Sequence, residues 1–184
     1  MVIIKKNYYL YIENIKDLNL DKLINNKKIN IILRNIKNNK LAEIKKYRQK
    51  CKNKNINFYI ANSAKFANLC NADGLYISAY NKKKYYINIP KIGSVHNLKE
   101  INEKIFQNCS TIIFSRLFKT QYDYKKTNLG VVRFNLISIS IGKNLVPLGG
   151  INNKNLLKLN MVKSDSFACL SALKKKPAIS NRLF

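Results

Sequence analysis

The stretch INFYIANSAKFANLCNADGLYISA, residues 56–79, decides the fold class because it holds a helix-like segment between two strand-like ones. INFYIAN (56–62) and GLYISA (74–79) are short apolar and aromatic runs of strand length. Between them, SAKFANLCN carries apolar residues at helical spacing with polar residues on the other side. A strand, a helix and a second strand in this order are typical of two parallel strands joined by a crossover helix.

The same alternation extends along the chain. Helix-like stretches such as KLAEIKKYRQKCKNKN, NLKEINEKIFQN and NNKNLLKLNMVKS separate most of the strand-like runs. Eight such units close most economically into a (β/α)8 TIM barrel, whose strands are buried on both faces and therefore read as continuous apolar runs. The remaining strand-like runs are residues 8–13, 29–35, 90–96, 110–118, 145–150 and 165–171.

The predicted barrel is trimmed. The connection YNKKKYYIN, between the fourth and fifth strand-like runs, is too short for a full helix. The 184 residues are also fewer than a TIM barrel usually has. We therefore expect a single α/β domain over residues 1–184, ending in a basic tail at residues 174–184.

The charge of the chain is strongly positive. Its 35 Lys and Arg against 9 Asp and Glu give a net charge of +26 and a pI near 10.0. Nucleic acids, acidic membranes and phosphorylated small molecules are all possible partners of such a protein. The alternative is a compositional bias, because Lys, Asn, Ile and Tyr are enriched together. The lysines are spread over nearly every segment and no nucleic-acid-binding motif is present, so a nucleic-acid partner is not favoured.

The sequence offers few signals for targeting, disulfides or metals. Its N-terminal apolar run is broken by Lys5 and Lys6, and no stretch approaches the ~20 apolar residues of a membrane span, so we expect a cytoplasmic protein. The cysteines are scattered without a CxxC pair, and His96 is far from them in sequence. We predict reduced, buried cysteines and no metal site built from them.

The segment VPLGGIN, residues 146–152, places two adjacent glycines after the seventh strand-like run. In many TIM barrels a phosphate binds between the loops that follow strands seven and eight. Gly149 and Gly150 would let backbone N–H groups donate to phosphate oxygens, with Ser171 beside them at the end of strand eight. The alternative for a glycine pair is a tight turn without a ligand.

Several segments, in order and spacing, resemble the thiamine phosphate synthase family, whose other branch comprises the thiazole tautomerases. These segments are LRN (33–35), FYIANSAKFANLCNADGLYISAYN (58–81), IGSVHNLKEI (92–101), FSRLFKT (114–120), VPLGGIN (146–152) and FACLSAL (167–173). The resemblance implies a TIM barrel that joins a hydroxymethylpyrimidine diphosphate to a thiazole phosphate, giving thiamine phosphate and diphosphate. It also implies Mg²⁺ as a cofactor.

The resemblance assigns diphosphate-binding roles to specific residues. Arg34 matches the family's arginine and would hold the diphosphate with its planar fork, unless it only caps the end of its strand. Ile36 stands at the partner lysine position, and Lys37 follows one residue later. Ser94 matches a serine that contacts the diphosphate in the family.

The resemblance also covers the later loops. Arg116 stands where the tautomerase branch has a histidine, and we expect it to neutralise charge in a synthase reaction. Thr120 keeps the first threonine of the family's Thr-x-Thr-Lys loop, whereas the loop lysine is missing and would be replaced by Lys119, Lys125 or Lys126. Gly149, Gly150 and Ser171 match the site of the thiazole phosphate.

The chain departs from the family at the metal-binding positions. The family's Asn-Asp pair falls on Ala61 and Asn62, and its second metal-binding Asp falls on Asn81. Two neutral amides do not offset the dehydration of Mg²⁺ as carboxylates do, so the cofactor is in doubt here. We assign no metal ligands, and we expect His96 to be structural.

Three functions remain open at this stage. The first is a divergent thiamine phosphate synthase in which Arg34, Arg116 and nearby lysines replace the charge of the metal. The second is a non-catalytic phospholigand-binding barrel of the thiamine pathway. The third is a basic protein that associates with nucleic acid, whose binding would weaken steeply with salt. The sequence makes no prediction about oligomeric state.

Overall fold

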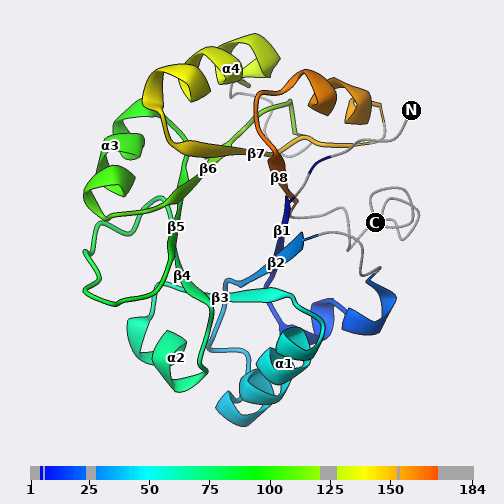
Figure 1. Ribbon diagram of the computed structural model, residues 1–184, viewed down its shortest axis with the longest axis vertical. Helices are drawn as coiled ribbons and strands as arrows, with labels where there is room; N and C mark the ends of the chain where they lie inside the picture. The colour runs from blue at the N-terminus through cyan, green and yellow to red at the C-terminus, as the bar shows by residue number, and fades with distance from the viewer. Residues whose placement is uncertain (1–4, 6, 24–27, 121–127, 153, 170–184) are drawn as a thin grey trace.

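The strands form one closed parallel barrel in the order β1-β2-β3-β4-β5-β6-β7-β8. The structure is a computed structural model that describes residues 5, 7–23, 28–120, 128–152 and 154–169. Figure 1 shows the strands as a ring with the helices around it, which confirms the predicted TIM barrel. The strands are β1 (Asn7–Ile12), β2 (Lys28–Leu33), β3 (Asn57–Ala61), β4 (Gly74–Ile77), β5 (Lys91–Val95), β6 (Thr111–Ser115), β7 (Asn144–Leu148) and β8 (Ser166–Cys169).

The helices lie outside the ring (Figure 1). The expected helix-like stretches at residues 63–71 and 97–108 contain α2 and α3, and α1 occupies most of KLAEIKKYRQKCKNKN. Among the described residues the β4–β5 connection has no helix, as its length predicts. The helices are α1 (Leu41–Asn53), α2 (Ala64–Leu69), α3 (Leu98–Phe106) and α4 (Gly130–Ile141), with short 3₁₀ helices η1 (Ile15–Asp17), η2 (Leu20–Lys22) and η3 (Leu156–Met161).

Two helical segments differ from the sequence-based expectation. NNKNLLKLNMVKS forms only the 3₁₀ helix η3 rather than an α-helix. Helix α4 was not predicted, because the apolar residues of GVVRFNLISISI are not confined to one face of the helix. Its buried residues are Phe134 and Ile137, whereas Val132, Leu136 and Ile139 are exposed on its outer side.

The barrel interior is filled in layers, each built from alternate strands, as in other TIM barrels. The strand register sets these layers, since it pairs Tyr11 with Ile32 and Ile32 with Tyr59. Of the three layers nearest the mouth, the lowest holds Tyr9, Tyr59, Ile92 and Val146, the middle layer holds Ile32, Tyr76, Ile113 and Ala168, and the layer nearest the carboxyl ends holds Tyr11, Ala61, Ser94 and Leu148. This last layer is the floor of the barrel mouth.

A second apolar core lies between the outer strand faces and the helices, and the cysteines belong to it. Cys51, Cys70, Cys109 and Cys169 are all buried and free, as predicted. Within the described part of the chain, no group of three or more His, Cys, Asp or Glu side chains could hold a metal ion. In the same residues, no helix is long and apolar enough to cross a membrane.

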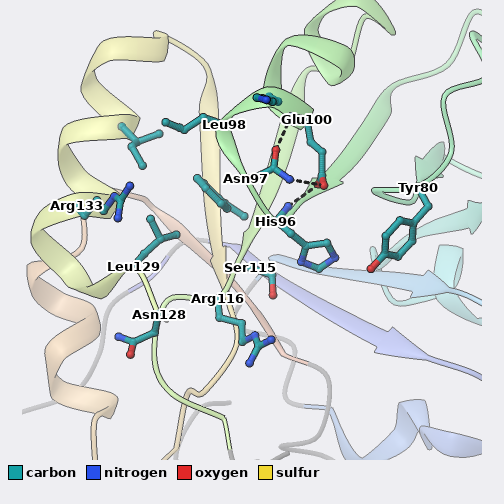
Figure 2. A pocket seen from close by; sticks show the side chains of 13 residues that line it. Tyr80, His96, Asn97, Leu98, Glu100, Ser115, Arg116, Asn128, Leu129 and Arg133 are labelled. Atoms are coloured by element: carbon teal, nitrogen blue, oxygen red, sulfur yellow. Dashed lines mark hydrogen bonds between the residues drawn. The ribbon is translucent and has the colours of Figure 1, made fainter. Parts of the chain in front are cut away.

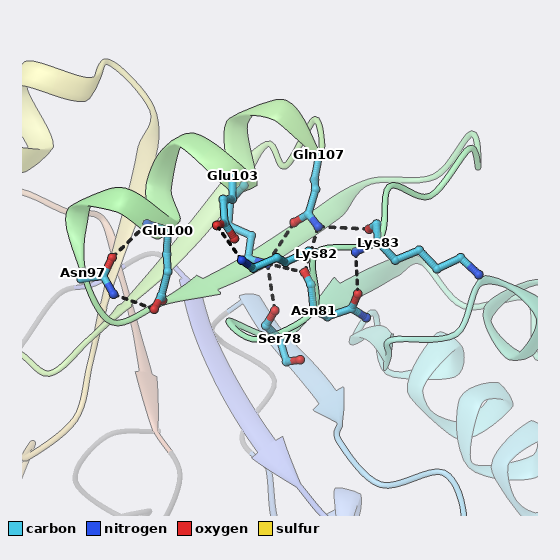
Figure 3. Close-up of polar contacts among 9 residues, drawn as sticks. Ser78, Asn81, Lys82, Lys83, Asn97, Glu100, Glu103 and Gln107 are labelled. Carbon is cyan, nitrogen blue, oxygen red and sulfur yellow. Dashed lines mark hydrogen bonds and ion pairs between the residues drawn. The ribbon is translucent and has the colours of Figure 1, made fainter.

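A buried lysine from α3 holds the β4–β5 connection in place of the missing helix. Lys104 is fully buried, and its Nζ donates to the carbonyls of Ser78 (2.8 Å) and Asn81 (2.9 Å) and to Gln107 Oε1 (2.9 Å). Gln107 Nε2 donates in turn to the Asn81 and Lys83 carbonyls (Figure 3). Burial lowers the pKa of the Lys104 ammonium. Gly93 makes room for this side chain, since a Cβ there would lie 2.8 Å from Lys104 Cδ.

A Lys104→Met substitution should destabilise the fold. It keeps the aliphatic stem but removes the donor from buried carbonyls, so we expect the free energy of unfolding to fall by about 2–3 kcal/mol in urea denaturation. Lys99→Met is the matched control, because Lys99 is exposed on the same helix and its loss should change stability by less than about 0.5 kcal/mol. Equal urea midpoints for the two variants would show that the buried lysine does not hold the connection.

The buried thiols predict a loss of stability in alkali. Burial raises the pKa of Cys109 to about 11 and of Cys51 and Cys169 to about 12. A thiol whose pKa is higher in the folded than in the unfolded chain stabilises the fold as long as it keeps its proton in both states, which holds below the unfolded pKa near 9. This contribution to the free energy of unfolding is lost as the pH rises toward 12.

Between pH 8 and pH 10.5 each of these thiols should remove about 1–2 kcal/mol from the free energy of unfolding. Cys169→Ala isolates one thiol, since burial is the cause of its shift. Urea denaturation at both pH values should therefore show a smaller alkaline loss in this variant than in the wild type, and an identical loss would refute the assignment.

Candidate active site at the carboxyl ends of the strands

The predicted site residues that the structure describes follow the carboxyl ends of the strands or lie in the layer beneath them. Because all strands are parallel in one closed barrel, these ends share one mouth. Arg34 follows β2, Asn62 follows β3, Arg116 follows β6 and Gly149 follows β7. Ser171 lies outside the described residues.

Arg34 stands at the rim of the mouth beside the floor. Its Nη1 is 3.3 Å from Glu13 Oε1, and both side chains are 44% exposed. Its guanidinium carbon lies 5.8 Å from the centroid of the Tyr11 ring, which belongs to the floor layer. The fork of Arg34 is thus held by a carboxylate and an aromatic face while remaining accessible to an anion.

Lys37 is not brought into this arrangement by any contact found among the described residues. It is exposed in the turn that follows β2, where its backbone N–H donates to Asn35 Oδ1 at 3.1 Å. A role for Lys37 in binding the same anion as Arg34 therefore stays a prediction.

Ser94 lies in the floor of the mouth, on β5. Its side chain is buried, and its Oγ accepts a hydrogen bond of 2.8 Å from the Tyr76 hydroxyl. The Tyr11 hydroxyl donates to that of Tyr76 at 3.4 Å. Sequence reasoning found Ser94 but not the two tyrosines, because only the strand register brings their hydroxyls together.

Asn62 and Asn81, at the family's metal-binding positions, are joined by a hydrogen bond. Asn81 Nδ2 donates to Asn62 Oδ1 at 3.0 Å, and the Ser78 N–H donates to the same oxygen at 2.9 Å. Tyr85 completes the cluster, since its hydroxyl accepts from Asn81 Nδ2 and donates to the Asn62 carbonyl. The two positions are adjacent in space although they are far apart in sequence.

The donor set of this cluster does not fit Mg²⁺. Asn62 Oδ1 already accepts from two N–H groups, and Asn81 Oδ1 accepts from the Lys83 N–H at 2.9 Å. Neither amide carries charge, and Ala61 offers no ligand at all. Mg²⁺ binding sites in proteins use carboxylates, because the ion gives up its water reluctantly.

The loop after β6 brings Arg116 and Thr120 together. Arg116 Nη1 donates to Thr120 Oγ1 at 3.1 Å. The same loop continues along β7, where the Leu117 N–H donates to the Leu148 carbonyl and the Phe118 N–H to that of Gly149. The expected loop-lysine substitutes Lys125 and Lys126 lie outside the described residues, and Lys119 is exposed.

This loop is also what approaches the glycine pair most closely. Gly149 (φ +99°) would direct a Cβ to 3.1 Å from Arg116 Cγ, and Gly150 (φ +71°) would direct one into the Phe118 backbone. The backbone at Gly149 and Gly150 thus packs against the protein itself. That these glycines bind a phosphate therefore remains a prediction. The close approach of the β6 loop already explains why no side chain fits at either position.

A cavity of about 800 Å³ opens from the mouth between α3 and α4 (Figure 2). Arg116, His96 and Tyr80 line it toward the barrel, and Arg133 of α4 lines it on the other side. Sequence reasoning missed both Tyr80 and Arg133. Tyr80 lies within the segment 58–81 but was given no role there, and Arg133 lies on α4, which was not predicted.

The backbone of His96 has a structural role, whereas its imidazole ring is exposed. Its backbone N–H donates to Glu100 Oε2 at 2.7 Å, which fixes the entry into α3. Its ring lies 5.9 Å from that of Tyr80, centroid to centroid, at the wall of the cavity. The expected structural role thus describes its backbone, whereas its imidazole is available to a ligand.

Comparison with known sequences identifies related proteins. A family profile described as thiamine monophosphate synthase matches residues 19–173. The thiamine-phosphate synthase of Prochlorococcus marinus is 29% identical over 142 residues, a match that covers 74% of this chain and 41% of that protein. The chain thus spans less than half the length of this curated relative.

Comparison with solved structures supports the fold. A thiamine phosphate pyrophosphorylase from Pyrococcus furiosus superposes with a TM-score of 0.76 at 20% identity, covering 97% of this chain and 91% of that one. A 3-keto-L-gulonate-6-phosphate decarboxylase from Vibrio cholerae gives a TM-score of 0.66 at 13% identity, covering 97% and 95% of the two chains.

A Gly150→Ala substitution should destabilise the protein strongly. The new Cβ would meet the rigid backbone of Phe118 at a positive φ, so we expect the free energy of unfolding to fall by roughly 2–4 kcal/mol. Gly142→Ala is the matched control, since Gly142 has a φ of +62° but no atom near its Cβ position, and it should lose only about 1 kcal/mol. If thermal or urea denaturation gives the two variants equal stability, the β6 loop does not press on Gly150.

Proposed function

The chain belongs to the thiamine monophosphate synthase family, and we propose on that ground that it joins a hydroxymethylpyrimidine diphosphate to a thiazole phosphate. The products are thiamine phosphate and diphosphate. The observation that carries this proposal is the barrel mouth, where Arg34 and Ser94 adjoin one floor and Arg116 stands on the rim.

The reaction places its main demand on the leaving group. The bond between the pyrimidine methylene carbon and the diphosphate oxygen breaks, both electrons leave with the diphosphate, and the thiazole nitrogen bonds to that carbon. Negative charge therefore grows on the diphosphate, and preorganised donors aimed at it lower the barrier. Arg34 supplies a fixed cationic fork and Ser94 a hydroxyl donor, while Arg116 supplies a second cation from the β6 loop.

The thiazole phosphate would bind on the other side of the mouth. Thr120 lies within hydrogen-bonding distance of Arg116, and the same loop packs on Gly149 and Gly150. A phosphate here would be held by Arg116, by the Thr120 hydroxyl and by backbone N–H groups of the glycine segment. The cavity between α3 and α4 then offers Arg133 and His96 as further groups near this anion.

Charge neutralisation in this proposal does not depend on Mg²⁺ at the Asn62 and Asn81 positions. Their amide oxygens are occupied by N–H donors, so arginine side chains must provide the compensation. Glu13 pairs with Arg34 but leaves it nearly half exposed, so an incoming diphosphate competes with a single carboxylate.

The same amide pair favours a second candidate function, a non-catalytic phospholigand-binding barrel of the thiamine pathway. A barrel of this kind would keep the phosphate-binding groups while lacking the means to expel diphosphate. It differs from the synthase in one observable respect, since it binds thiazole phosphate or thiamine phosphate without turnover.

An assay for thiamine phosphate with both precursors tests the proposal. We expect turnover that persists when EDTA replaces Mg²⁺, and we expect Arg34→Ala to lower kcat by about 100-fold or more, because it removes a transition-state cation. Lys46→Ala is the control for charge alone, since Lys46 is exposed on α1.

Three results would change the assignment. Loss of all turnover in EDTA would show that a metal is required in spite of the amide pair. Turnover that Arg34→Ala leaves intact would remove this residue from the mechanism. Binding of thiazole phosphate without turnover, measured by calorimetry, would replace the synthase with the non-catalytic binder.

A further inference from the structure

The floor of the mouth contains a chain of hydroxyl groups that runs through two layers of the barrel. Tyr11 donates to Tyr76, and Tyr76 donates to Ser94, with oxygen–oxygen distances of 3.4 and 2.8 Å. Tyr76 belongs to the middle layer, whereas Tyr11 and Ser94 belong to the floor layer above it. All three side chains are at least 94% buried.

The direction of this chain decides what Ser94 can offer a ligand. A hydroxyl has one hydrogen to donate and two lone pairs that accept. Because Ser94 Oγ accepts from Tyr76, its own hydrogen remains for a partner in the mouth above. Each hydroxyl that donates along a chain also polarises the next one, which makes the last donor stronger.

The surrounding contacts hold the tyrosines in position. The Tyr11 and Tyr76 rings pack edge to face, with centroids 5.4 Å apart and an interplanar angle of 83°. The Tyr11 ring also lies beneath the Arg34 guanidinium. One rigid aromatic pair therefore contacts both groups, since Tyr76 bonds to the Ser94 hydroxyl and the Tyr11 ring packs against the Arg34 guanidinium.

Burial favours the donating form of the Tyr11 hydroxyl. Burial raises the pKa of Tyr11 well above its ordinary value, with further contributions from the neighbouring Tyr76, while Arg34 acts in the opposite direction. A tyrosine hydroxyl is protonated at neutral pH in any case, and the raised pKa extends this donating form of Tyr11 into the alkaline range.

We propose that Tyr76 is a positioning residue that holds the Ser94 hydroxyl as a hydrogen-bond donor to the diphosphate of the pyrimidine substrate. This inference rests on the proposed function, since it names how one group of that site is aimed. Tyr76 does not touch the ligand, and its contribution passes entirely through Ser94.

Calorimetric titration with inorganic diphosphate tests this proposal on the full chain. We expect Ser94→Ala to weaken diphosphate binding about tenfold and Tyr76→Phe to weaken it by a similar or smaller factor. The double variant should bind no more weakly than Ser94→Ala alone, because a residue that acts only through Ser94 has no effect once that hydroxyl is gone. Purely structural damage from Tyr76→Phe would instead persist in the double variant.

Tyr59→Phe is the matched control. It removes another buried hydroxyl from the barrel interior, in a different layer, and should leave diphosphate binding unchanged. Thermal denaturation of each variant checks that the barrel is intact.

The outcomes separate this inference from the function on which it rests. Wild-type protein that binds diphosphate and forms thiamine phosphate, with Tyr76→Phe equal to wild type or with additive losses in the double variant, would overturn the positioning role alone. Wild-type protein that neither binds diphosphate nor turns over would overturn both proposals. Weaker binding in each single variant, with no further loss in the double variant beyond that of Ser94→Ala, would support the chain of hydroxyls as described.

Discussion

Closure of the parallel strands into a barrel is the constraint on which the rest of the structure depends. Closure with this register sends every second side chain into a confined interior, where the side chains of alternate strands must share each layer. Tyr9, Tyr11, Tyr59 and Tyr76 fill much of that space with rings whose hydroxyls must find partners. The polar character of the floor therefore follows from how the interior is filled.

Much of this architecture could be predicted from the sequence, because parallel strands buried on both faces read as continuous apolar runs. The end of the seventh run also located the glycine pair at the mouth, whereas Arg34, Asn62 and Arg116 were assigned through the family resemblance. Helix α4 escaped prediction, since its apolar residues lie on its exposed side as well as on its buried one. Partners that lie on different strands escaped too, because the order of residues along one strand does not reveal its register with the next.

The glycine pair lies in close contact with a neighbour, as its sequence indicates, but that neighbour could not be named from the sequence. The sequence indicates only that something comes close to residues 149 and 150. The structure identifies that neighbour as the chain's own β6 loop, at Arg116 and Phe118. Such a contact joins two loops of the mouth, so that packing against the end of β7 helps to hold Arg116 and Thr120 in place.

The buried ammonium of Lys104 supports the β4–β5 connection through its backbone and not through its side chains. Lys104 binds carbonyl oxygens of residues 78 and 81, and every amino acid has such an oxygen. The support of the backbone at residue 81 therefore does not depend on which side chain stands there. A carboxylate at this position would sit on the same backbone support as the present amide, so the chemistry of this part of the mouth can differ without a matching loss of the fold.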